Sequence, residues 1–101
     1  MNDIRDILKE RGSRYGDFKT HADIAQKLKL IWVASPGADI VRHLDRETAA
    51  VINEGMDMVF HKIARICNGD PTYIDSYTDI IGYTQLIIDH LNREEACEGE
   101  D

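Results

Sequence analysis

The sequence predicts an all-α fold, and three observations favour this class. Apolar residues recur three and four positions apart along most of the 101 residues, which is the period of an α-helix. No stretch has the alternation of period two that is typical of a strand. The two prolines, Pro36 and Pro71, both stand between the helical patterns. We therefore expect one helical domain over residues 1–93, built as a four-helix-type bundle, and a disordered acidic tail over residues 94–101.

The first two expected helices stand on either side of a turn-rich stretch. The first helix covers residues 3–11 and ends at Gly12, because glycine is common directly after a helix. Two glycines mark the stretch at residues 12–18. The second helix covers residues 20–33, and its apolar stripe consists of Ile24, Leu28, Ile31 and Trp32. A break follows it, and residues 40–44 form a short segment with no clear assignment.

The third expected helix has a recognisable start. Asp45 is suited to its N-cap, because a carboxylate there accepts hydrogen bonds from free backbone N–H groups. Glu47 places a negative charge in the first turn, where it suits the helix dipole. We expect this helix to continue to about Cys67, with an apolar stripe of Ile52, Met56, Val59, Phe60, Ile63 and Ile66.

The last expected helix follows a tight connection, NGDPT at residues 68–72. We expect Asn68 or Gly69 to take the left-handed conformation that often ends a helix, and Pro71 to prevent continuation. The last helix then covers residues 73–92, with an apolar stripe of Tyr77, Ile80, Thr84, Ile87, Ile88 and Leu91. A connection this short makes the last two helices antiparallel neighbours.

Charge and composition exclude several classes of function. The net charge of −7 argues against a nucleic-acid-binding surface, which needs clustered lysine and arginine. No segment approaches the roughly 18 apolar residues that cross a membrane, and the charged start MNDIRDILKERG is unlike a signal peptide. Cys67 and Cys97 lack the spacing of a metal site, and we expect no disulfide between them. These features predict a cytoplasmic protein without a membrane or nucleic-acid partner.

The two long helices carry acidic residues at helical spacing. Glu54 and Asp57 are three positions apart, and Asp75 and Asp79 are four apart. The carboxylates of each pair share a helix face and repel each other unless a cation lies nearby. If the two pairs converge, they suit Mg²⁺ or Mn²⁺, which prefer carboxylate oxygens. The alternative is an ordinary polar face in contact with solvent, and His61 would share that face.

Residues 54–87, EGMDMVFHKIARICNGDPTYIDSYTDIIGYTQLI, carry a resemblance to a known family. They contain E-x-x-x-M-x-x-x-K-x-x-R, a loop, and D-x-x-x-D-x-x-G-Y. In this order the segments resemble phage and prophage MazG-like proteins of the all-α nucleoside triphosphate pyrophosphohydrolase superfamily. The upstream RGSRYGDF, residues 11–18, is also similar to small phage members. The matching parts cover about half of the chain.

The resemblance implies chemistry on nucleoside triphosphates. Enzymes of this superfamily use Mg²⁺ or Mn²⁺ to cleave an NTP or dNTP into a monophosphate and pyrophosphate. The implied metal ligands, of which the first two are also candidates for the general base, are Glu54, Asp57, Asp75 and Asp79. The implied substrate-binding residues are Lys62, Arg65, Tyr83 and Trp32. Because superfamily members typically build the site near a subunit interface, we also expect a homodimer or homotetramer.

The acidic pairs depart from the usual family motif, which is E-x-x-E, a spacer and E-x-x-D. Aspartate replaces glutamate at two places, and the second pair is four positions apart instead of three. A shorter side chain moves the metal-binding oxygen back by about one methylene. This departure bears on catalysis more than on the fold, and it leaves open a non-catalytic protein that binds a nucleotide or a protein partner.

The other site residues have structural alternatives. Lys62 and Arg65 would pair equally well with nearby acidic residues, and Tyr83 and Trp32 would serve as packed aromatic side chains. RYGDF is either a loop on the substrate side or a packed turn. A third possibility for the whole chain is a purely structural interaction protein.

Overall fold

The computed structural model describes residues 3–99, without the side chains of residues 13–14 and 94–99. The described range contains five α-helices and no strand, which confirms the all-α class. The helices are α1 (Ile4–Tyr15), α2 (Phe18–Val33), α3 (Pro36–Arg42), α4 (Arg46–Asn68) and α5 (Ile74–Gly99). None of these helices combines the length and the apolar character that a membrane crossing requires.

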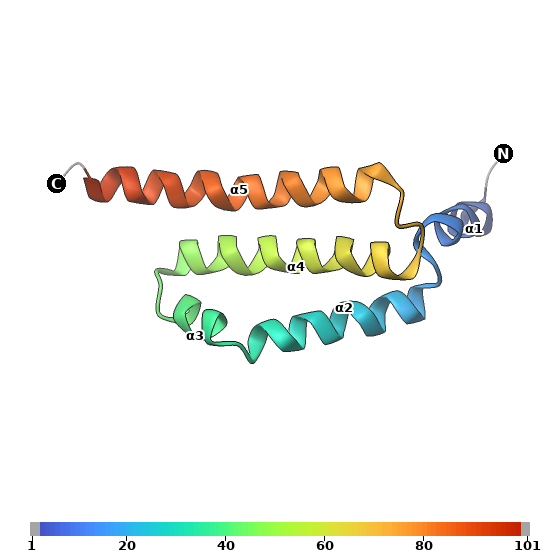
Figure 1. Cartoon of the computed structure of the whole chain (residues 1–101), viewed down its shortest axis with the longest axis horizontal. Coiled ribbons are helices and arrows are strands. Elements are labelled where there is room, and N and C mark those ends of the chain that lie inside the picture. Colours follow the sequence, from blue (N-terminus) through green and yellow to red (C-terminus); the bar gives the residue numbers. More distant parts are fainter. Residues whose placement is uncertain (1–2, 100–101) are drawn as a thin grey trace.

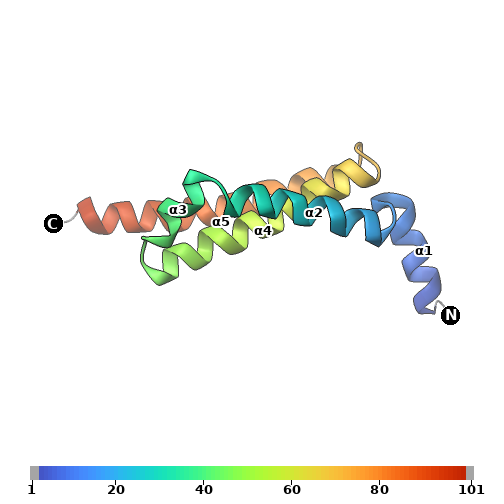
Figure 2. The same ribbon diagram turned by 90° about the horizontal axis from the view of Figure 1, so that it is seen from below.

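The three longest helices, α2, α4 and α5, lie side by side in one layer with α4 in the middle (Figure 1). Helices α2 and α5 each pack on α4, and in the described part of the chain they do not touch each other. When the molecule is turned by 90°, the three helices overlap, as expected for a layer one helix thick (Figure 2). Helix α1 lies at one end of this layer and α3 near the other (Figure 1).

The first turn of the chain is held by a glycine and by a side chain from α4. Helix α1 does not end at Gly12 as predicted, but continues to Tyr15 and ends at Gly16, whose φ is 77°. Only glycine adopts this backbone conformation at little cost. Asn68 Nδ2 donates to the carbonyls of Tyr15 (3.0 Å) and Asp17 (2.8 Å). The α1–α2 junction is thereby fixed against the end of α4.

Helices α2 and α3 begin earlier than predicted. Asp17 caps α2, because its Oδ1 accepts a hydrogen bond from the Thr20 backbone N–H at 3.0 Å. Helix α3 begins at Pro36, inside the segment predicted as a break. Proline suits the first position of a helix because the N–H that it lacks would have no partner there.

Helix α4 begins after Asp45 as predicted, and Asp45 Oδ2 accepts from the Thr48 backbone N–H at 2.9 Å. The prediction of a left-handed residue at its end was wrong. Asn68 belongs to the helix, and Gly69 has a φ of −127°. Instead, Asp70 Oδ1 accepts from the Thr72 backbone N–H and hydroxyl and orders the turn.

Helix α5 continues to Gly99, past the predicted end at residue 92. It includes residues 94–99 of the predicted acidic tail, and residues 100–101 of that tail lie outside the described residues. The two long helices approach closely at Gly55, where a Cβ would lie 2.5 Å from Ile87 Cδ1. Glycine at this position therefore permits the α4–α5 contact.

The layer buries little apolar surface. The buried apolar residues are all small or medium-sized, namely Ala25, Ala38, Val41 and Ala64, and no large described side chain is fully buried. The radius of gyration is 16.7 Å, against about 13 Å for a compact domain of this length. The described residues thus form a small core for a domain of this length.

Helix α4 has two open sides, because α2 and α5 pack on its other two. Asn53 meets α2 through Trp32, whereas Gly55 and Lys62 meet α5. One open side carries a line of isoleucine and valine, and helical spacing places apolar residues of α2 and α5 beside it. We call this set the apolar face: Ile24, Leu28, Ile31, Ile52, Val59, Ile63, Ile66, Tyr77, Ile81 and Ile88. Its rim is open, since Ile31 and Ile81 are 66% and 67% exposed.

Candidate functional site

The other open side of α4 carries polar residues. Glu54, His61 and Arg65 follow one another at helical spacing with Met58 between them, so that they form a line along the helix. Helix α5 contributes Asp79 and Tyr83 to the same side. We call this set the polar face: Glu54, Met58, His61, Arg65, Asp79 and Tyr83. Two hollows lie along it, one between α4 and α5 and one where α1 and α2 meet α4.

The α4–α5 hollow has a volume of about 550 Å³, which is within the range of small-molecule sites. It brings together two predicted site residues, Glu54 and Tyr83. The rest of its wall is mostly apolar and consists of Glu47, Ala50, Val51, Gly55, Met58, Leu86, Ile87, His90 and Arg93. An apolar wall with a few charged groups is typical of a site for an organic ligand.

Two further predicted residues, Lys62 and Asp79, form an ion pair between α4 and α5. Lys62 Nζ lies 2.8 Å from Asp79 Oδ2, and the Lys62 side chain is only 11% exposed. A buried ammonium needs a nearby negative charge, so Asp79 compensates Lys62 in this structure. This arrangement corresponds to the structural alternative for Lys62, and it occupies one of the four predicted metal ligands.

The remaining acidic residues lie apart from this pair. Asp75 is exposed and accepts a hydrogen bond from the Tyr73 hydroxyl at 2.8 Å. Asp57 is half-buried, and neither it nor Glu54 has an ion-pair partner among the described residues.

The register of α4 against α5 separates the two acidic pairs. Asp79 lies beside Lys62, and Glu54 precedes Lys62 by eight residues, which is about 12 Å along a helix. Among the side chains that the structure describes, no three histidine, cysteine, aspartate or glutamate residues form a group that could hold a metal ion. The donors of the single chain thus do not fit a complete metal site. The predicted Mg²⁺ or Mn²⁺ site stays a prediction.

Trp32 lies away from both hollows. Its Nε1 donates to Asn53 Oδ1 at 3.1 Å, and a Cβ on Gly37 would lie 3.2 Å from its ring. Trp32 therefore packs between α2, α3 and α4, as in the structural alternative. Cys67 is a free, exposed cysteine, and the side chain of Cys97 lies outside the described residues.

The second hollow, which we call the α1–α2–α4 hollow, has a volume of about 430 Å³. Arg65 reaches it from α4, and its guanidinium carbon lies 4.2 Å from the centre of the Tyr15 ring. Arg65 was a predicted site residue, and the RYGDF segment was predicted as either a loop on the substrate side or a packed turn. The hollow also contains residues that were not predicted, and the described residues of its lining are Leu8, Arg11, Gly12, Tyr15, Gly16, Phe18, His21, His61 and Arg65.

Two histidines in this hollow contact each other across α2 and α4. His21 Nε2 lies 3.1 Å from His61 Nδ1. Burial, followed by the positive charge of Arg65, lowers the pKa of His61 to about 4 and also lowers the pKa of His21. Both rings are therefore neutral at pH 7. His21 is buried, and its Nδ1 has no hydrogen-bond partner in the described part of the chain.

Comparisons of the chain with models of protein families, with curated proteins and with solved structures give no match.

Proposed function

We propose that this chain binds a nucleoside triphosphate or a related nucleotide on the polar face. The observation that carries this proposal is the α4–α5 hollow, where Glu54 and Tyr83 share a wall of suitable size and mixed chemistry. The resemblance of residues 54–87 to MazG-like proteins supports the same ligand class. On this proposal the chain controls part of a nucleotide pool in phage growth.

Hydrolysis is the second candidate function, in which water cleaves an NTP or dNTP into its monophosphate and pyrophosphate. Two observations favour it: Glu54 and Asp57 lie one turn apart, and neither has an ion-pair partner among the described residues. Mg²⁺ or Mn²⁺ would neutralise phosphate charge in such a reaction. A complete metal site would require either that Asp79 leave Lys62 or that a second subunit contribute carboxylates.

We also propose that the chain works as a homodimer or homotetramer. The apolar face is the support, since burying it against a second copy would add a second layer to the core. If α4 and α5 of one copy pack on α4 and α5 of another, the four helices form a bundle between two chains, whereas the sequence predicted a four-helix-type bundle within one chain. Assembly through the apolar face leaves the polar face of each subunit accessible.

The test combines turnover with binding. The purified chain is incubated with each NTP and dNTP in Mg²⁺ or Mn²⁺, pyrophosphate is measured, and calorimetry records binding. Pyrophosphate release that is lost in Glu54→Gln but kept in Asp23→Asn, on the exposed side of α2, supports hydrolysis. Binding without release supports the binding function alone. If neither is detected, both proposals fail.

A further inference from the structure

We propose that the α1–α2–α4 hollow is a metal-independent site for a phosphate attached to an aromatic ring, as in a nucleotide. In this site Arg11 and Arg65 bind the phosphate, and Phe18 stacks on the ring. The choice of a nucleotide as the ligand class rests on the proposed function. The site itself uses none of the carboxylates considered above.

The charge of the hollow differs from that of the whole chain. The chain has 19 acidic and 12 basic residues, yet the lining contains two arginines and no carboxylate. Neither Arg11 nor Arg65 has an ion-pair partner among the described residues. A planar guanidinium donates two parallel hydrogen bonds to phosphate oxygens, so two unpaired arginines favour a phosphate over a neutral ligand.

The aromatic side chains point to a ring in the ligand. Phe18 is 79% exposed although it lines a hollow, and its ring lies 6.1 Å from the ring of His21. Stacking of a base on such a ring is worth about 1–3 kcal/mol in single-stranded nucleic-acid sites. Tyr15 has a different task, because the Arg65 guanidinium lies over its ring and is held in the hollow.

The buried histidine pair includes a polar atom without a hydrogen-bond partner among the described residues. His21 is 6% exposed and lines the hollow, and its Nδ1 has no partner among the described residues. Buried polar atoms are normally hydrogen-bonded, and exceptions mark places where a water or ligand binds. This nitrogen is covered in the free chain, so pairing it with a hydroxyl or amino group of the bound nucleotide requires a small shift of the His21 ring.

The framework of the hollow is fixed without a ligand. Asn68 holds the carbonyls on both sides of Gly16, and a Cβ on Gly16 would lie 2.2 Å from the Asn68 backbone oxygen. The α1–α2 junction therefore stays beside Arg65. A site prepared in this way loses less entropy when it binds.

The test measures binding in EDTA by calorimetry with AMP, GMP, CMP and UMP. Adenosine supplies the ring alone, and ribose 5-phosphate supplies the phosphate alone. At least one nucleotide is expected to bind, and each partial ligand to bind about tenfold more weakly or worse. If ribose 5-phosphate matches the best nucleotide, the ring contact is absent and the inference is overturned.

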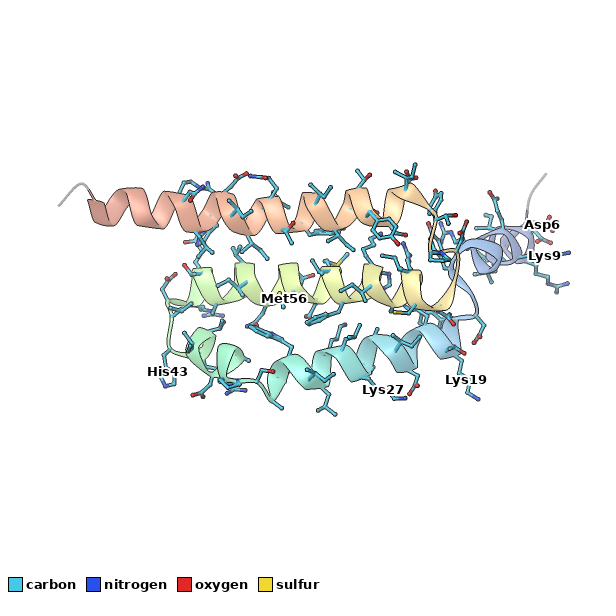
Figure 3. All side chains as sticks on the ribbon, viewed as in Figure 1. Asp6, Lys9, Lys19, Lys27, His43 and Met56 are labelled. Atoms are coloured by element: carbon cyan, nitrogen blue, oxygen red, sulfur yellow. The ribbon has the colours of Figure 1, made fainter. Side chains whose placement is uncertain are left out.

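Matched variants locate the site. Arg11→Gln and Phe18→Ala change exposed side chains and are each expected to weaken binding about tenfold. Lys9→Gln removes the same charge from α1 as Arg11→Gln does, and Lys19→Gln changes the position next to Phe18 in α2. Both lysine side chains extend from the outside of the molecule (Figure 3), and neither lines the hollow. Both controls should bind as the parent chain does. Equal weakening in the lysine variants, or no nucleotide binding in EDTA, refutes the inference.

Failure of this site and failure of the proposed function give different results. Glu54→Gln should abolish any pyrophosphate release, whereas Arg11→Gln should weaken binding in EDTA. If the chain hydrolyses nucleotides and Arg11→Gln leaves binding in EDTA unchanged, the inference fails while the function stands. If there is no turnover but Arg11→Gln still loses binding, the inference stands without hydrolysis.

Discussion

The two open sides of α4 differ in chemistry, since one exposes apolar side chains and the other exposes charged side chains. The apolar face presents a continuous line of large aliphatic side chains, which water solvates poorly. The polar face presents Arg65, which has no ion-pair partner among the described residues, and two carboxylates of which only Asp79 is paired, and both hollows lie along it. An exposed apolar surface favours contact with another protein surface. Charged residues that line a hollow favour binding of a small charged ligand. We therefore assign assembly to the apolar face and ligand binding to the polar face, on opposite sides of α4.

The largest effect is expected from Ile63→Asp, at the centre of the apolar face. An unpaired carboxylate buried between two subunits should destabilise the assembly by about 3–4 kcal/mol and yield monomers. Light scattering coupled to size-exclusion chromatography measures the change. Met58→Asp places the same side chain on the polar face and should leave the mass unchanged. If Met58→Asp dissociates the protein and Ile63→Asp does not, we have assigned the two faces the wrong way round.

The next effect concerns the support of the α1–α2–α4 hollow. Gly16→Ala must accommodate a side chain at a φ of 77° and beside the Asn68 backbone, which should cost about 2–3 kcal/mol in unfolding free energy. Gly82→Ala is the matched control, because a Cβ there meets nothing within 4 Å and a helix interior favours alanine by about 1 kcal/mol. Urea denaturation measures both. A neutral Gly16→Ala would show that the junction is not held as described.

The Lys62–Asp79 pair tests how the centre of the polar face is held. Asp79→Ala leaves a nearly buried lysine without its partner and should cost about 1–2 kcal/mol, because Asp79 itself is 45% exposed and partly screened. The exposed Lys27–Asp23 pair provides the contrast, and Asp23→Ala should cost less than about 0.5 kcal/mol. Thermal unfolding compares the two variants. Equal losses would mean that burial of Lys62 does not strengthen its pair.

Parts of this fold were predictable from the sequence and other parts were not. The all-α class and the start of α4 at Asp45 were predictable, because periodicity and capping are local signals. Gly12 was misleading, since a glycine can continue a helix and only the conformation of Gly16 stops the chain. Helix α3 was missed because Pro36 was interpreted as a break, although proline also suits a first turn.

The candidate site was harder to predict for a different reason. Spacing within a helix shows which residues share a face, but the register between two helices depends on contacts such as Gly55 with Ile87. That register separates Glu54 from Asp79, which spacing alone suggested might converge. The α1–α2–α4 hollow combines residues from three helices, and only the fold brings Arg11 and His61 to the same hollow.

The last expected effect is a pH dependence that arises from the contacting histidines His21 and His61. Burial and Arg65 lower the pKa of His61 from its ordinary 6.5 to about 4, and His21, Lys62 and Lys29 act in the same direction. Between these two values the unfolded chain binds a proton that the folded chain does not, so stability falls as the pH falls from about 6.5 to about 4.

Asp17 and Asp45 contribute little to the change in stability over this pH range. The pKa of each lies below its ordinary 3.8 because each caps a helix, so both carboxylates contribute only at lower pH. Urea titrations at pH 7, 6 and 5 should show a smaller loss in His61→Asn than in the parent chain. His43→Asn, at an exposed position on the outer side of α3, should keep the full loss. If the unfolding free energy of His61→Asn declines as much as that of the parent chain, the His21–His61 pair does not cause the loss of stability in acid.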